Sequence, residues 1–150
     1  MNNKNKNLNL KKISKLIRYE VIRLVHETGT AHLGSALSCI DILVSIYFSK
    51  NGFKKKVNDK KNVKDTFILS KGHAALAFYV ILEKKKYISK KTLNTYSLPG
   101  SFLEEHPNIK VNGVLVSSGS LGHGLSYAAG LSLADKIHNK NYQHMVLMSD

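Results

Sequence analysis

The sequence predicts an α/β domain in which helices flank a mainly parallel sheet. Two short apolar runs, at residues 66–69 and 145–148, have the length and composition of buried strands. Segments whose apolar residues recur at helical spacing precede and separate these runs, and polar turns join them. Strands that alternate with helices in this way are typical of a parallel sheet.

The first expected helix starts at residue 13 and ends near residue 28. It is indicated by the helical spacing of Ile13, Leu16, Ile17, Val21, Leu24 and Val25. Gly29 can supply the positive φ of a helix end, and residues 28–35 follow as a loop. Residues 1–12 are polar and basic and are assigned to a tail, so the expected domain comprises residues 13–150.

The middle of the chain contains three further expected helices and the first strand. The second helix begins near Ser38 and turns four apolar side chains inward, those of Ile42, Leu43, Ile46 and Tyr47. Strand 66–69 follows a lysine-rich connection, and the third helix follows from residue 74 to about 85. Ser89 is expected to cap a shorter fourth helix that ends at Tyr96.

The last third of the chain is expected to contain a long loop, a helix and the second strand. Residues 98–119 hold both prolines and several glycines, which favours a loop. A fifth helix is expected over residues 121–138, before strand 145–148. Because Asp150 follows that strand directly, no helix remains to cover the sheet, and we expect the fold to be incomplete at the C-terminus.

The formal net charge of +13 comes almost entirely from lysine. Only Arg18 and Arg23 among the 23 basic residues are arginines, whereas nucleic-acid recognition relies on bidentate guanidinium groups. The lysines gather with asparagines at residues 1–12, 50–64 and 84–91, a pattern typical of solvated faces. We therefore expect no nucleic-acid partner.

The cysteine content and hydropathy indicate where the protein works. Cys39 is the single cysteine of the sequence and lies in an apolar run, which is typical of a core residue in a reducing compartment. No stretch reaches the roughly 18 to 20 apolar residues of a membrane span, and the N-terminus lacks the apolar core of a signal peptide. We expect a cytoplasmic protein without a membrane partner.

Histidines beside glycines recur in the predicted loops. They occur at residues 31–34 (AHLG), 70–73 (SKGH) and 122–124 (GHG), and His106 precedes Pro107. Loops at strand ends bind ligands in α/β folds, glycine lets backbone amides approach a phosphate, and histidine can donate to oxygen or move a proton. A single loop histidine is more often an ordinary polar residue, but the repetition favours a functional site.

Two further features concern anions and metals. Residues 117–124 (SSGSLGHG) run into the fifth helix, so their amides lie at its positive end, although a glycine-rich turn for tight packing explains the spacing equally well. Asp150 follows a strand, where metal and nucleotide sites of open sheets occur. The histidines lack zinc spacing, so ligation by nitrogen and sulfur is not suggested.

Four sequence blocks together resemble the transketolase family, most closely the separate N-terminal subunit of enzymes split into two chains. They are residues 27–36 (ETGTAHLGSA), 65–74 (DTFILSKGHA), 105–107 (EHP) and 119–124 (GSLGHG). The resemblance covers residues 13–150. It implies a thiamine diphosphate-binding fold and a transferase that moves a two-carbon ketol unit between sugar phosphates, as in the pentose phosphate pathway, with thiamine diphosphate and Mg²⁺ as cofactors.

The resemblance also implies roles for individual residues. His32 is similar to the family histidine that reaches sugar hydroxyls, His73 to the one beside the cofactor diphosphate and reaction centre, and His106 to the one that contacts hydroxyls of the cofactor-bound substrate. The loop at Gly119, Ser120, Leu121 and Gly122 is similar to the one that contacts the cofactor. Asp150 is similar to the aspartate that ligates Mg²⁺, although Ser149 replaces the family's preceding glycine.

Other parts that the resemblance requires are absent from these 150 residues. In the family, further Mg²⁺ ligands follow the aspartate, and a pyrimidine-binding domain from a partner subunit or domain supplies the activating glutamate. We therefore expect a C-terminal transketolase subunit as partner, a homo- or hetero-oligomer, and no catalysis by this chain alone. Two alternatives stay open: another thiamine diphosphate enzyme such as a 1-deoxyxylulose-phosphate synthase, and a non-catalytic basic binding module.

Overall fold

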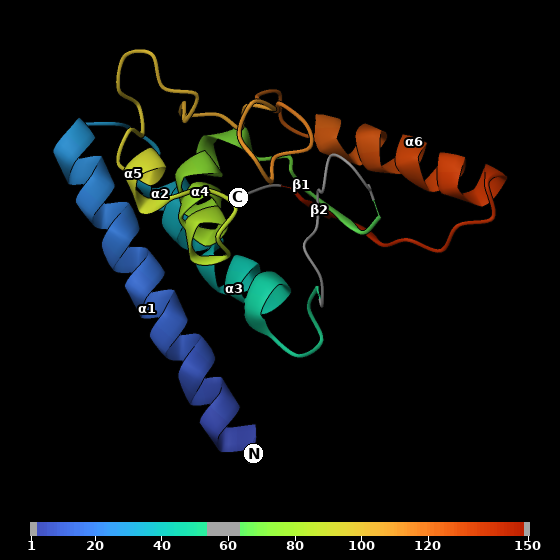
Figure 1. The fold of residues 1–150 in the computed structure, drawn as a ribbon, viewed down its shortest axis with the longest axis horizontal. Coiled ribbons are helices and arrows are strands. Elements are labelled where there is room, and N and C mark those ends of the chain that lie inside the picture. The colour runs from blue at the N-terminus through green and yellow to red at the C-terminus, as the bar shows by residue number, and fades with distance from the viewer. Residues whose placement is uncertain (1–2, 54–63, 149–150) are drawn as a thin grey trace.

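The computed structural model describes residues 3–53 and 64–148 (Figure 1). One group of helices packs around α4 (Ala75–Lys84), and α1 (Asn3–Thr28) lies along one side of this group. Helix α6 (His123–Ile137) lies on the other side of the strands β1 (Thr66–Leu69) and β2 (His144–Leu147). The described residues therefore form a helix-rich α/β structure with a small parallel sheet, which confirms the predicted fold class.

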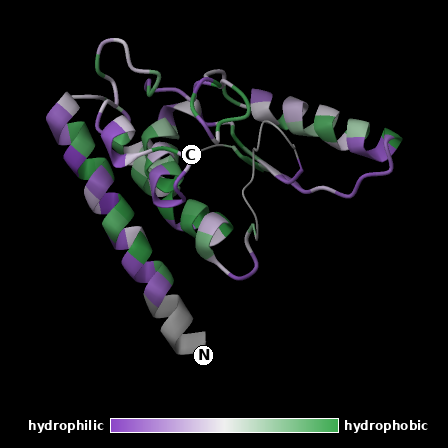
Figure 2. Ribbon diagram, in the orientation of Figure 1, coloured by the Kyte–Doolittle hydropathy of each residue, from purple (hydrophilic) through white to green (hydrophobic). Residues whose placement is uncertain are grey.

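Helix α1 is amphipathic and longer than predicted. Ile17, Val21 and Leu24 are buried against α3 and α4, and polar and apolar segments alternate along the helix (Figure 2). The helix begins at Asn3 instead of near residue 13, and thus includes most of the segment that the sequence assigned to a tail. Leu10, which is partly buried against the core, extends the apolar spacing by one helical turn and accounts for that part of the longer helix.

The second expected helix corresponds to α3 (Ile40–Phe48), which begins two residues after Ser38. A further short helix, α2 (Leu33–Ser38), precedes it, so the prediction that the loop extends to residue 35 is wrong. The residues that α3 buries are Ile40, Leu43, Val44 and Tyr47. The prediction that Ile42 turns inward is wrong, because its side chain is 48% exposed, and Ile46 is only partly buried. The inward face is set by Ile40, one helical turn before Leu43, and Ile42 lies outside that stripe.

Helix α4 is the centre of the core. Every residue from Ala75 to Leu82 is buried, because helices α1, α2, α3 and α5 (Lys90–Leu93) contact it from different sides. The 3-10 turn η1 (Gly72–Ala74) leads into it from β1. Ser89 caps α5 as predicted by accepting a hydrogen bond from the Thr92 amide at 3.0 Å, but α5 ends at Leu93, short of Tyr96.

The two strands pair in parallel, with Leu69 opposite Leu147. The first strand has the predicted bounds, and the second begins and ends one residue earlier than predicted. All four residues of β1 are buried, whereas those of β2 are half-buried. The Ser70 amide donates to the Leu147 carbonyl at 2.8 Å, so residues 70–73 lie at the carboxyl edge of the sheet, where the chain also leaves β2.

Helix α6 contacts the strands along one narrow stripe, in which Gly124 and Ala128 are buried. Large apolar side chains elsewhere on this helix are exposed.

The described part of the chain contains no helix that is long and apolar enough to cross a membrane. Cys39 is buried, in agreement with its predicted place in the core.

Candidate functional site

His32, His73 and His106 come together although they lie on three separate segments of the chain. The ring centroids of His32 and His73 are 5.5 Å apart, and those of His32 and His106 are 6.2 Å apart. His32 and His106 are exposed and His73 is half-buried. The fold therefore brings these three predicted residues to one solvent-accessible place.

His32 is the residue that ends the turn between α1 and α2. It occupies the N-cap position of α2 with a φ of 68°, in the left-handed region that a residue with a Cβ rarely adopts. Its carbonyl accepts a hydrogen bond from the Ala36 amide at 3.1 Å. This backbone conformation directs the chain so that the imidazole lies beside the other two histidines.

His73 and His106 are placed by the core. His73 lies in η1, directly after β1, at the carboxyl edge of the sheet. The carbonyl of His106 accepts a hydrogen bond from the hydroxyl of Tyr79 at 2.8 Å. Burial raises the pKa of the Tyr79 phenol well above its ordinary value, so the hydroxyl stays protonated and remains a donor.

The glycine loop, residues 117–124, lies against the same cluster. A Cβ added to Gly119 would lie 3.6 Å from Cδ2 of His106. A Cβ on Gly72 would lie 2.8 Å from the same atom and 2.5 Å from the carbonyl oxygen of Ser118. Position 72 therefore requires glycine, because only a hydrogen fits between the strand end, the His106 ring and the loop.

The loop ends at the first turn of α6. Gly122 is the N-cap residue with a φ of 84°, and Gly119, Ser120, Leu121 and Gly122 are all exposed. Amides at such a helix start lie at the positive end of its dipole. His123 does not join the histidine cluster in the described ring contacts, and its Nε2 lies 3.3 Å from Oγ of Ser120.

Asp150, the predicted metal ligand, lies outside the described residues. Within the described part of the chain, no group of three or more histidine, cysteine, aspartate or glutamate side chains could hold a metal ion. The chain leaves β2 at the edge where residues 70–73 lie. The assignment of Asp150 to Mg²⁺ remains a prediction.

Some residues that shape the site were not singled out from the sequence. Tyr79 lies in the buried and almost entirely apolar part of α4. A hydroxyl-bearing residue among apolar residues is the local feature of the sequence that could have indicated its role. Ser70 and Ser118 lie next to or within the blocks that carry the resemblance, but sequence gives no sign that their hydroxyls bind backbone atoms of the opposite segment.

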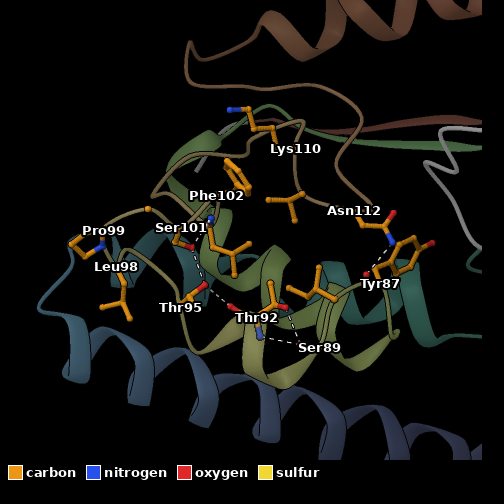
Figure 3. Close-up of a pocket in the computed structure, with 14 residues that line it drawn as sticks. Tyr87, Ser89, Thr92, Thr95, Leu98, Pro99, Ser101, Phe102, Lys110 and Asn112 are labelled. Carbon is orange, nitrogen blue, oxygen red and sulfur yellow. Dashed lines mark hydrogen bonds between the residues drawn. The ribbon is translucent and has the colours of Figure 1, made fainter.

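A separate cavity of about 570 Å³ lies between α5 and the loop that carries His106 (Figure 3). Its hydroxyl groups bond to one another, as between Ser89 and Thr92 and between Thr95 and Ser101. None of the predicted site residues lines it. Because these hydroxyls already bond to one another, they are less available to bind a ligand than the imidazoles of the histidine cluster.

The site combines groups that suit a phosphate-bearing ligand. Neutral imidazoles can donate to or accept from hydroxyls, and the exposed loop amides at a helix start can donate to phosphate oxygens. Loops at the carboxyl edge of parallel strands are the usual ligand sites of α/β folds. The fold and the site thus have the features typical of α/β domains that bind phosphate-bearing cofactors or substrates.

Comparison with known proteins identifies the family. Residues 9–147 match the family model described as "Transketolase, thiamine diphosphate binding domain". The chain is 38% identical over 134 residues, 89% of its length, to one subunit of the apulose-4-phosphate transketolase of Phocaeicola vulgatus. It is 37% identical over 145 residues, 94% of its length, to the subunit of the same name from Actinobacillus succinogenes. It is 30% identical over 143 residues, also 94% of its length, to human transketolase, of which it covers 23%.

The chain belongs to the transketolase family and corresponds to the N-terminal subunit that carries the thiamine diphosphate-binding domain. It spans about half the length of the two bacterial relatives, 47% and 51% respectively. Each of these relatives is named as one subunit of its enzyme, which implies that a partner subunit completes that enzyme. Among the alternatives that the sequence left open, these matches favour the transketolase interpretation.

Proposed function

We propose that the chain provides the diphosphate-binding side of a split transketolase that transfers a two-carbon ketol unit between sugar phosphates. The observation that carries this proposal is the convergence of His32, His73 and His106 with the glycine loop at the carboxyl edge of the sheet. The family match supports the same cofactor, because the matched domain is a thiamine diphosphate-binding domain.

The residues present fit thiamine diphosphate by the chemistry of their donors. Residues 119–122 would hold the diphosphate through backbone amides, and His73 would donate to it from the strand end. When bound, the cofactor supplies the nucleophilic carbon and the electron sink that transfer of a two-carbon unit requires. The protein's own contribution is to place the substrates against it.

The histidine cluster would act on the sugar. His32 and His106 are exposed, so their imidazoles can hydrogen-bond to sugar hydroxyls without further desolvation. His73, only half-buried and 5.5 Å from His32, can hold or move a proton between a hydroxyl and the cofactor side of the site. Tyr79 fixes the backbone of His106 and so keeps its ring in the cluster.

The proposal includes Mg²⁺, with Asp150 as one ligand, and a partner subunit that completes the site. A diphosphate carries several negative charges, and loop amides offset only part of them, so a cation has to supply the rest. Mg²⁺ prefers near-octahedral oxygen coordination, and Asp150 alone would provide one ligand. The 150-residue chain by itself should therefore bind the cofactor poorly and be inactive.

Calorimetric titration of Mg²⁺-thiamine diphosphate tests the proposal. The 150-residue chain is compared with a chimaera that continues into the second half of the Phocaeicola vulgatus relative, mixed with that enzyme's other subunit. We expect a micromolar Kd for the assembled chimaera and a Kd at least about 100-fold higher, a difference of about 2.7 kcal/mol, for the chain alone. Asp150→Asn in the chimaera should abolish the Mg²⁺ dependence.

Two results would contradict the proposal in different ways. Micromolar binding by the isolated chain would show that the account of the metal site is wrong. An assembled chimaera that binds the cofactor but transfers no ketol unit between a ketose phosphate and an aldose phosphate would refute the proposed reaction while leaving the binding role intact.

A further inference from the structure

Three side-chain hydroxyls form a chain of hydrogen bonds in the turn that leads to His32. The hydroxyl of Thr28 donates to the carbonyl of Leu24 at 2.7 Å, and Oγ1 of Thr28 lies 3.0 Å from Oγ1 of Thr30. The hydroxyl of Thr30 is also hydrogen-bonded to the phenol of Tyr96. The hydroxyl chain therefore joins the end of α1 to the segment that follows α5.

The direction of each hydrogen bond in the hydroxyl chain follows from the hydrogens available. A hydroxyl has one hydrogen, and that of Thr28 is given to the Leu24 carbonyl. Thr30 must therefore donate to Thr28, and the Tyr96 phenol must donate to Thr30. Burial raises the pKa of the Tyr96 phenol above its ordinary value of 10, so the phenol keeps the hydrogen that it donates.

The turn contains two residues in the left-handed backbone conformation. Gly29 has a φ of 65° and His32 a φ of 68°, and Thr30 lies between them. Glycine adopts this conformation readily, whereas a histidine keeps it only where surrounding contacts fix the backbone. The Gly29 amide donates to the Val25 carbonyl at 2.9 Å, and the His32 carbonyl accepts from the Ala36 amide at 3.1 Å. The hydroxyl chain adds a side-chain restraint between these two backbone bonds.

Tyr96 is in turn fixed by the core. Its side chain is buried, and its ring packs edge-on against the ring of Tyr79, with the centroids 6.3 Å apart. The hydroxyl of Tyr79 donates to the carbonyl of His106. Two buried tyrosines in ring contact thus each hold one histidine-bearing segment, Tyr79 that of His106 and Tyr96 that of His32.

We infer that Tyr96, acting through the two threonines, is a positioning residue that fixes residues 29–32 and so holds the His32 imidazole in the histidine cluster. This inference rests on the proposed function and deepens it, because it makes the contact of His32 with a sugar hydroxyl depend on hydroxyls outside the site. None of the three hydroxyls touches a ligand in this account.

NMR on the 150-residue chain tests the position of the ring. The ring protons of His32 and His73 should give a nuclear Overhauser effect in the wild type, because their ring centroids are 5.5 Å apart. Thr30→Val, which keeps the shape of the side chain without its hydroxyl, and Tyr96→Phe should each lose this effect. The His32 ring signals should move toward those of an unstructured peptide. Amides of α4 report whether each variant folds.

Two further variants separate the hydroxyl from other effects of substitution. Thr30→Ser keeps the hydroxyl and should retain the contact between the two rings. Thr92→Val is the matched control, because it removes a threonine hydroxyl that is bonded to Ser89 on the exposed side of α5 and not to the turn. Its His32 signals should match those of the wild type.

Kinetics of the assembled chimaera test the effect on the substrate. We expect Thr30→Val and Tyr96→Phe to raise the KM for a ketose phosphate at least about fivefold and to leave the Kd of Mg²⁺-thiamine diphosphate within about twofold. The two constants separate because His32 is assigned to the sugar and other residues to the diphosphate. Thr30→Ser and Thr92→Val should leave both constants within about twofold.

The outcomes separate the inference from the proposed function. A contact between the His32 and His73 rings that is absent in the wild type, or unchanged in folded Thr30→Val and Tyr96→Phe, would overturn the positioning role. A displaced ring with unchanged KM, or an equal loss of cofactor affinity, would overturn the link to substrate binding. A chimaera without ketol transfer would contradict the proposed function, whereas the NMR measurement would still decide whether Tyr96 places His32.

Discussion

His32, at the centre of the histidine cluster, is one of four described non-glycine residues with a positive φ. His32 has a φ of 68°, which costs about 1 kcal/mol or more for a side chain with a Cβ. Such strain persists where the surrounding structure fixes it, and it occurs often at functional sites. At His32 the consequence is visible, because its ring is the one that lies near both His73 and His106.

Substitution of His73 by alanine should affect catalysis much more than folding. The residue is half-buried in a 3-10 turn and contributes little to the core, so we expect the melting temperature to stay within a few degrees. Turnover of the assembled enzyme should fall at least about tenfold, which corresponds to about 1.4 kcal/mol in the barrier. Steady-state kinetics and thermal melting of the same preparation measure both quantities.

His26→Ala is the control for this experiment, because His26 is exposed on α1 and has no contact with the cluster in the described structure. Its turnover should match that of the wild type. A His73→Ala enzyme with unchanged turnover would remove His73 from the mechanism.

Local sequence was enough to find the histidines and not enough to find what holds them. Each of His32, His73 and His106 stands in a loop near glycine or proline, which is a local signal. Ser118 acts through Leu69, which is 49 residues earlier in the chain. A hydroxyl whose partner is that distant gives no periodicity or motif of its own, so its role became visible only in three dimensions.

At the scale of elements, both strands and the helices α4 and α6 were predicted to within one or two residues, whereas the start of α1 and the break between α2 and α3 were not predicted. The strand Thr66–Leu69 and the helix Ala75–Lys84 are buried on nearly all sides and were predicted almost to the residue. The start of α1 was missed because asparagines, poor helix formers, separate the lysines and leucines of residues 3–10. The break between α2 and α3 also left no clear mark in the sequence, which has neither proline nor glycine at Ser38 or Cys39.

A charged cluster fastens α1 to α5. Glu20 accepts hydrogen bonds from Arg23, at 3.1 Å, and from Lys90. Arg23 also donates to Asn94 at 2.9 Å, just after α5. Burial alone would raise the pKa of Glu20, but the hydrogen bonds from Lys90 and Arg23 outweigh it and lower the pKa below its ordinary value of 4.5.

Glu20→Gln should lower the free energy of unfolding by about 1 kcal/mol at pH 7, because exposed and half-buried ion pairs contribute at this level. The pKa of the Glu20 carboxyl is lower in the folded chain than in the unfolded chain, so the ionised carboxylate stabilises the fold at pH values above its pKa in the unfolded chain. This stabilisation is lost as the pH falls through its pKa in the folded chain. The difference between the two proteins should therefore shrink below pH 4.5 and vanish when Glu20 is protonated in both states. Urea denaturation across roughly pH 3 to 7 measures it.

Glu104→Gln serves as the control for the change in net charge. Glu104 is exposed and accepts only an amide hydrogen bond from Asn108 in the described structure. If it destabilises the protein as much as Glu20→Gln does, the effect is due to overall charge and the assigned cluster is not its cause.

At the scale of the whole molecule, helix α6 differs from every other long helix of the described chain. It is apolar on almost all sides, yet only Gly124 and Ala128 are buried. The exposed side chains include Leu125, Tyr127, Leu133 and Ile137. Helices that are apolar all round are normally buried, so α6 has the composition of a helix that further protein surface should cover.

We expect the 150-residue chain to self-associate through α6 at concentrations of tens of micromolar and above. The exposed fraction is 60% for Leu133 and 68% for Ile137, and each buried side chain of this size contributes about 1.5–3 kcal/mol, so a few contacts offset the cost of weak association. The formal net charge of +13 opposes association, and added salt should therefore strengthen self-association.

Leu133→Gln combined with Ile137→Gln should shift the sedimentation coefficient toward that of a monomer. The control, Leu16→Gln with Tyr19→Gln, removes two apolar side chains that are exposed to a similar degree on α1 and should leave association unchanged. Sedimentation velocity at two salt concentrations distinguishes these expectations: a wild-type chain that stays monomeric at high salt, or equal effects of the two double variants, would show that α6 is not the associating surface.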